Sequence, residues 1–187
     1  GAGNLLGREQ SGDILSVGFD MYLKLLDEAI RELEESEEEG PPEPYLELEY
    51  TGYIPDTYID EPVEKMEVYK KIAAVGTEEE LESVQGELED RFGPLPDEVN
   101  SLLSLAEIRI ICKKLYVSSL KERKGNVEIE FSKLAVVSPD RVLELIRAGG
   151  GKVRLDPNRP QVLRMETGSV GLKEKSEFIR SKLSSLL

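Results

Sequence analysis

The sequence has no histidine and only one cysteine, Cys112, among its 187 residues. Without histidine the chain has no Ser-His-Asp or Cys-His catalytic arrangement, and it shows no zinc-ligand spacing, phosphate-binding loop or calcium loop. Cys112 lies in an apolar helical pattern, so we expect a buried thiol rather than a nucleophile. The sequence therefore predicts a non-catalytic protein that needs no cofactor and no metal.

Long apolar runs are also missing. No stretch of about 18 apolar residues is present, so we expect no transmembrane helix. The first residues do not resemble a signal peptide, and a single cysteine cannot form a disulfide framework. We therefore expect a cytoplasmic protein that makes no membrane contact.

Basic residues are scarce in one part of the chain only. The formal net charge is −14, from 38 acidic and 24 basic residues. Residues 27–67 contain 16 acids and two bases, whereas residues 101–187 contain 10 acids and 17 bases. The two regions are therefore expected to attract each other or partners of opposite charge.

The segment TEEELESVQGELEDRFGPLP, residues 77–96, contains the signals for both ends of a helix. Thr77 and Glu80 have the spacing of a capping box, and the acidic first turn suits the positive end of the helix dipole. Gly93 and Pro94 end the helix. One apolar stripe is expected to face a core, formed by Leu81, Val84, Leu88 and Phe92.

Three stretches of the chain together carry a family resemblance. They are ELEDRFGPLP at residues 87–96, YKKIA at residues 69–73 with its spacing to the following helix, and the first 30 residues. The chain resembles the C-terminal part of the bacterial transcription-repair coupling factor. Residues 1–12 resemble the end of a motif that this translocase shares with the RecG helicase, and the chain from Leu48 onward resembles the small C-terminal regulatory domain.

The resemblance implies a regulatory role within a longer protein, an ATP-dependent DNA translocase. In that family the C-terminal domain docks on an N-terminal UvrB-like module, masks the surface that recruits UvrA, and restrains the motor until RNA polymerase is engaged. DNA is contacted only through the motor. The resemblance assigns interdomain docking to Glu87, Asp90 and Arg91, and places Gln10 in the translocation-motif loop.

Helical spacing provides a second interpretation of the same three residues. Glu87 and Asp90 are three apart, and Glu87 and Arg91 are four apart, so they share a helix face and can pair with opposite charges on a partner. The alternative is that Glu87 and Arg91 only pair with each other on the surface.

An N-terminal arm is expected to precede the main domain. Asp13 can cap a helix whose apolar stripe runs from Leu15 to Leu33. The acidic run at residues 34–39 and the prolines that follow predict a linker, because like charges repel and proline does not continue a helix. We therefore divide the chain into residues 1–44, which hold the end of the translocation motif, the arm and the linker, and residues 45–187, the regulatory domain.

The domain itself is predicted to be α+β, with several helices and a small, mainly antiparallel sheet preceded by the N-terminal helical arm. Val63, Met66, Tyr69, Ile72 and Ala73 are expected to mark the first helix of the domain. Ser138 is expected to cap a later helix, with Pro139 in its first position. The predicted strands cover residues 45–51, 118–122, 127–131, 152–156 and 162–166, and the predicted helices cover 63–73, 77–92, 97 onward, 139 onward and 172–187.

The basic second half leaves other functions open. It could form a nucleic-acid patch, although it lacks interleaved exposed aromatic residues and a known motif, which favours a solvated or partner-facing surface. The alternative functions are a self-standing protein-protein adaptor and a weak nucleic-acid-binding module. The residues concerned are Lys121, Arg123, Lys124, Arg154, Arg159 and Arg164.

Overall fold

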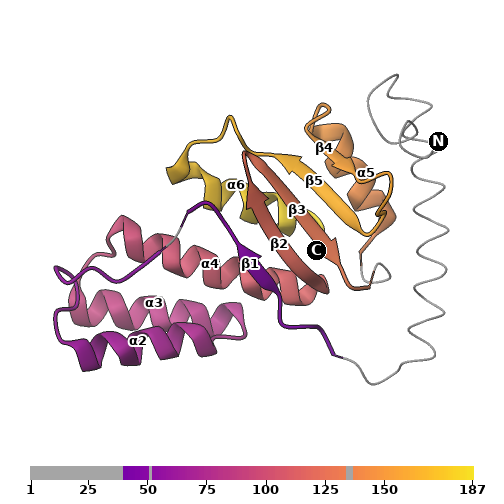
Figure 1. The fold of residues 1–187 in the computed structure, drawn as a ribbon. Helices are drawn as coiled ribbons and strands as arrows, with labels where there is room; N and C mark the ends of the chain where they lie inside the picture. Colours follow the sequence, from indigo (N-terminus) through magenta and orange to yellow (C-terminus); the bar gives the residue numbers. More distant parts are fainter. Residues whose placement is uncertain (1–39, 51, 134–136) are drawn as a thin grey trace.

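The structure is a computed structural model that describes residues 40–50, 52–133 and 137–187 (Figure 1). The arm expected over residues 13–33, the acidic run and Gln10 lie outside the described residues, so the division at residue 44 stays a prediction. The described helices are α2 (Pro62–Ala74), α3 (Glu78–Phe92), α4 (Asp97–Lys114), α5 (Pro139–Ala148) and α6 (Leu172–Ser184). The strands are β1 (Tyr45–Glu47), β2 (Val117–Arg123), β3 (Asn126–Phe131), β4 (Val153–Leu155) and β5 (Val162–Glu166).

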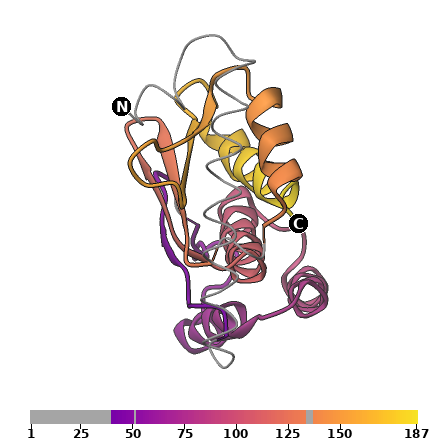
Figure 2. The same ribbon diagram turned by 90° about the vertical axis from the view of Figure 1, so that its right-hand side faces the viewer.

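The five strands form one mixed sheet in the order β1-β2-β3-β5-β4. β1 runs parallel to β2, and the other three pairs are antiparallel. Helices α4, α5 and α6 lie against one face of the sheet, as the view along its edge shows (Figure 2). Among the described residues, no helix covers the opposite face. The α+β prediction with a mainly antiparallel sheet is confirmed.

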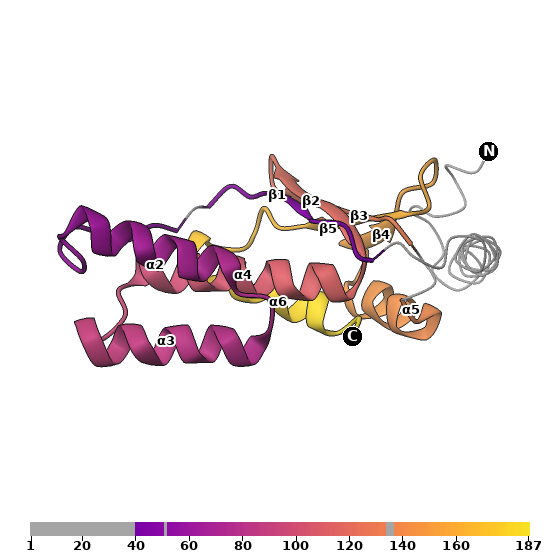
Figure 3. The same cartoon turned by 90° about the horizontal axis from the view of Figure 1, so that it is seen from below.

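The longest helix, α4, separates two hydrophobic cores. Ile108, Ile111 and Cys112 belong to the core beneath the sheet, which α6 also joins. Val99 and Ile110 belong to a second core with α2 and α3. Because α4 is apolar on two sides, it joins the helical layer of α2 and α3 to the sheet (Figure 3).

The first helix of the domain is present, but the residues that marked it do not all lie on its buried face. Val63 is 64% exposed and Met66 is 55% exposed, whereas the buried residues of α2 are Val68 and Ile72. Residues five apart on an α-helix are separated by about 140° around its axis, so a helix that buries Val68 turns Val63 toward solvent. Met66 lies six residues before Ile72 and is likewise directed away from the core. The sequence pattern identified the helix but not the face that it buries.

Local end signals were predicted more accurately than strand lengths. The Thr77 side chain accepts a hydrogen bond from the Glu80 amide at 3.2 Å, as expected, while the Glu80 carboxylate accepts from the Gly76 amide rather than from that of Thr77. The strand expected over residues 45–51 ends at Glu47. Ser138 occupies the N-cap of α5, but its side chain makes no capping hydrogen bond.

The Cys112 thiol is expected to be unreactive in the folded protein. Its side chain has no exposed surface, and burial raises its pKa to about 12, so almost none of it is thiolate near neutral pH. An aromatic disulfide reagent should label the native chain slowly, at a rate set by unfolding, and should label the chain in concentrated urea at once. Rapid labelling without denaturant would contradict this burial.

None of the described helices is both long enough and apolar enough to span a membrane.

A candidate docking surface on α2 and α3

The α2–α3 pair packs against α4, and α3 lies on the side of α4 that faces away from the sheet (Figure 3). Leu81 and Leu88 bury one side of α3 in the second core. Arg109 of α4 donates hydrogen bonds to the carbonyl oxygens of Val75, at 2.8 Å, and Ile72, at 3.3 Å, at the end of α2. The Ile72 carbonyl also accepts from the Val75 amide at 3.3 Å. Side-chain hydrogen bonds to the last carbonyls of a helix fix its end, so α2 is held firmly on α4.

The C-terminal end of α3 is held by a tyrosine. The Tyr58 hydroxyl lies 2.8 Å from the carbonyl oxygen of Gly93 and 3.1 Å from that of Leu88, and it can donate its proton to either. The Tyr58 ring also packs against Phe92, with ring centroids 5.7 Å apart. Gly93 has a φ of 89°, a left-handed conformation that favours glycine. These contacts position the helix end that carries the predicted docking residues.

Two of the three predicted docking residues form ion pairs with residues of α2. The Glu87 carboxylate lies 2.7 Å from Lys71 Nζ and 3.3 Å from an Arg91 nitrogen. Arg91 also lies 3.4 Å from Glu64, and its guanidinium carbon is 4.8 Å from the centroid of the Phe92 ring. We call Glu64, Lys71, Glu87 and Arg91 the charged seam.

Asp90, the third predicted residue, is exposed at the edge of the seam. It makes no hydrogen bond or ion pair with any residue in the described part of the chain. The ion pair between Glu87 and Arg91 that the alternative interpretation expected is also present on the surface. This pairing does not bury either group, since the two side chains keep 39% and 42% of their exposure.

The charged seam favours the ionised form of Glu87. The hydrogen bond from Lys71, followed by its charge and by the contacts with Arg91, lowers the pKa of Glu87 despite some desolvation. A lowered carboxyl pKa adds stability above the pKa of the unfolded state, and this stability is lost as the pH falls through the folded value. At neutral pH Glu87 is therefore ionised.

The helix as a whole is strongly acidic. α3 carries seven acidic side chains and one arginine among its 15 residues. Most of these acids are exposed, so the α2–α3 layer presents a negative surface on which Lys71 and Arg91 are paired. A surface of this charge is complementary to a basic partner.

Sequence reasoning missed Glu64 and Lys71, which complete the seam. Lys71 is 16 residues from Glu87, and Glu64 is 27 residues from Arg91. Only the packing of α2 beside α3 brings them together. A fixed helical spacing, such as the one that singled out Glu87 and Arg91, carries no signal for contacts between helices.

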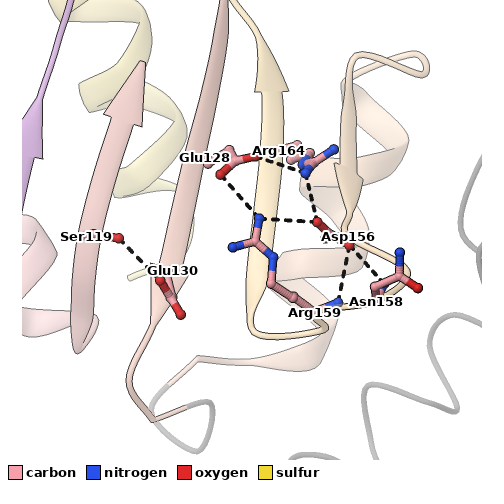
Figure 4. A network of polar contacts seen from close by, with 7 residues as sticks. All are labelled: Ser119, Glu128, Glu130, Asp156, Asn158, Arg159 and Arg164. Atoms are coloured by element: carbon pink, nitrogen blue, oxygen red, sulfur yellow. Dashed lines mark hydrogen bonds and ion pairs between the residues drawn. The ribbon is translucent and has the colours of Figure 1, made fainter. Parts of the chain in front are cut away.

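The basic residues of the second half lie mostly on the uncovered face of the sheet, where acidic neighbours pair with them. Arg164 lies 2.9 Å from Asp156 and 2.9 Å from Glu128 (Figure 4). Arg159 lies 3.3 Å from Glu128 and 3.5 Å from Asp156. Figure 4 shows the two guanidinium groups directed toward the same two carboxylates.

Asp156 is the buried centre of that cluster, with 4% of its surface exposed. Burial opposes its ionisation, but the backbone amides of Asn158 and Arg159 and the charges of Arg164 and Arg159 outweigh burial and lower the pKa of Asp156. Arg123 lies 3.3 Å from Glu47, and Arg154 lies 3.9 Å from Glu166.

Lys121 lies 5.5 Å from the centre of the Tyr45 ring, and Lys124 is exposed at the β2–β3 turn. Of the six basic residues, four have acidic partners and one lies over an aromatic ring. The face therefore offers few free cations to a phosphate backbone. No cluster of acidic residues or cysteine suited to a metal ion is found in the described part of the chain.

Three comparisons relate this geometry to known proteins. A family model described as the TRCF domain matches residues 48–142, just over half of the chain. A protein of Borreliella burgdorferi named transcription-repair-coupling factor is 34% identical over 186 residues, covering 100% of this chain. A protein of the same name from Haemophilus influenzae is 40% identical over 152 residues, covering 79% of this chain.

The chain is much shorter than these relatives, spanning 16% of the first and 13% of the second. A solved structure extends the likeness to the fold. The crystal structure of a C-terminal domain of transcription-repair coupling factor matches with a TM-score of 0.70 and 26% sequence identity, over 79% of this chain and 94% of that one.

Proposed function

The chain belongs to the family of transcription-repair coupling factors, and from this premise we propose that it is the non-catalytic regulatory module of such a protein. Membership connects it with transcription-coupled DNA repair. The longer protein, called the parent below, is in this proposal an ATP-dependent DNA translocase that releases stalled RNA polymerase and recruits UvrA. The module holds the parent in a closed state by docking on its N-terminal UvrB-like module and masking the UvrA-binding surface.

The observation that carries this proposal is the charged seam on a firmly held helix pair. Docking requires a surface that keeps its shape, and Arg109 and Tyr58 fix the ends of α2 and α3. It also requires groups that remain accessible, and Asp90 is exposed while Glu87 and Arg91 stay partly exposed. Charged groups at the edge of an interface determine its specificity and association rate more than its affinity. Acidic side chains on a rigid helix therefore suit a contact that can form and break. The module needs no cofactor of its own.

Binding of this chain to the UvrB-like module of the same parent tests the proposal. Calorimetry should give a saturable one-to-one interaction that weakens as salt rises, because the contact includes charges on an acidic surface. UvrA should compete for the same module. The proposal fails if no binding is detected at low salt, or if UvrA and the chain bind the module together without competition.

The competing nucleic-acid function leads to a separate prediction. We expect the chain to bind duplex DNA only weakly at physiological salt, because its net charge is −14 and most cations on the sheet are already paired. Fluorescence anisotropy with a labelled duplex measures this. Sub-micromolar binding at physiological salt would show that the basic sheet face is available to DNA, and would favour the alternative function.

A further inference from the structure

Strand β1 is held on the sheet mainly by exposed contacts. It has three residues, lies at the edge of the sheet and makes the one parallel pairing among the described strands (Figure 1). Parallel pairing is slightly less stable per residue than antiparallel pairing. Glu47 forms an exposed ion pair with Arg123, and Lys121 lies over the exposed Tyr45 ring. Water and salt screen such contacts, so they contribute little to stability, and Leu46 packs only partly against the core.

The chain immediately after β1 is held much more firmly. The Glu49 amide donates a 3.0 Å hydrogen bond to the buried Glu122 carboxylate, and Tyr50 belongs to the core with 8% of its surface exposed. Gly52 lies so close to α4 that a Cβ atom there would collide with the backbone of that helix. The boundary between weakly and firmly held chain therefore falls at Leu48.

The strand at the opposite edge, β4, does not show this weakness. It is also three residues long, but two of its three side chains are buried in the core. Backbone hydrogen bonds of 2.9 Å continue beyond both of its ends, from the Asp156 amide to the Val162 carbonyl and from the Glu166 amide to the Lys152 carbonyl. Short length and an edge position therefore do not by themselves loosen a strand of this sheet.

We propose that residues 45–48, called the strap below, detach from the sheet as a unit that hinges at Leu48, while the other four strands stay paired. Detachment also breaks the exposed ion pair between Glu43 and Lys113, which are 2.7 Å apart. It exposes Pro44 and the partly buried Leu46, so the attached form predominates in the isolated chain.

Detachment of the strap lengthens the connection that leads into the domain. The four residues add roughly 13 Å of extended chain to the linker predicted before residue 45. The domain can then move farther from the preceding part of a longer protein without unfolding. This inference does not depend on which partner the domain docks against.

Amide hydrogen exchange of the 187-residue chain at low urea concentrations tests the proposal. Detachment exposes little surface, so exchange of the β1 amides that pair with β2 should depend only weakly on urea. Their opening free energy should be lower than that of the central strand β3, which should exchange by global unfolding with a steep urea dependence. The same opening free energy and the same urea dependence at β1 and β3 would overturn the proposal.

Two variants separate detachment from global unfolding. Val153→Ala removes buried methyl groups from β4, whose contacts persist when the strap is detached. It should accelerate exchange at β3 about tenfold or more and leave exchange at β1 unchanged. Leu46→Ala weakens the attached form itself, so it should accelerate exchange at both strands. Equal acceleration of β1 and β3 by Val153→Ala would mean that the two strands open together, and would refute the strap.

Discussion

Replacing Lys175 with alanine is expected to reduce the free energy of unfolding by about 3–5 kcal/mol, because it leaves a buried carboxylate without its counter-charge. Lys175 Nζ lies 3.1 Å from Glu122, whose side chain has no exposed surface, and 3.5 Å from Glu49. The other Glu122 contacts are a 2.7 Å hydrogen bond from the Thr167 hydroxyl and a 3.0 Å bond from the Glu49 backbone amide. Neither of these neutral donors replaces a positive charge.

Urea denaturation of the 187-residue chain measures this loss. A matched control pairs Glu122→Gln with Lys175→Met, which removes both charges and keeps an oxygen for the Glu49 amide. Replacing both members of a buried pair costs less than breaking it, so the double variant should recover much of the stability. The loss of an exposed ion pair costs at most about 1 kcal/mol. If Lys175→Ala lowers the free energy of unfolding by less than this, the pair is not shielded from solvent.

The buried pair also shows where sequence reasoning ends. The predicted strands and the final helix correctly contained Glu122 and Lys175, but nothing in either segment indicated that the two charges meet in the core. Glu122 lies on β2, in an alternating strand whose helix-facing positions are otherwise apolar. The contact depends on the packing of α6 against the sheet, a relation that no local pattern encodes.

Features set by neighbouring residues were predicted well. The start of α3 at Thr77 and its end at Gly93 follow from capping signals that lie within a few residues of each helix end. The burial of Val68 instead of Val63 was not predicted, because both faces of α2 carry apolar residues and only contact with α4 distinguishes them. The candidate site was predicted in the same way: the α3 residues were named, and their partners on α2 were not.

The second large effect concerns the three proposed docking residues. Replacing Glu87, Asp90 and Arg91 together with alanine should leave the chain folded, because surface changes usually cost within about 0.5 kcal/mol each. The substitutions leave Glu64 and Lys71 without their seam partners. Both keep more than 40% of their side-chain surface exposed and can be solvated by water.

In the parent, the same three substitutions should release the closed state. A loss of roughly 3 kcal/mol of closing free energy shifts the equilibrium between closed and open states by about two hundredfold. UvrA binding should increase, because the masked surface becomes available, and ATP turnover without polymerase should rise with it. Lys114→Ala is a useful control, because its ion pair with Glu78 at 3.4 Å lies at the opposite end of α3 from the seam.

The most direct test of the regulatory account is the affinity of UvrA for the parent that carries E87A/D90A/R91A, measured with the melting temperature of the same variant of this chain. The account predicts much tighter UvrA binding, with a melting temperature that falls by no more than a few degrees. Unchanged UvrA binding with a normal melting temperature would contradict it and would leave the charged seam as a solvated helix surface.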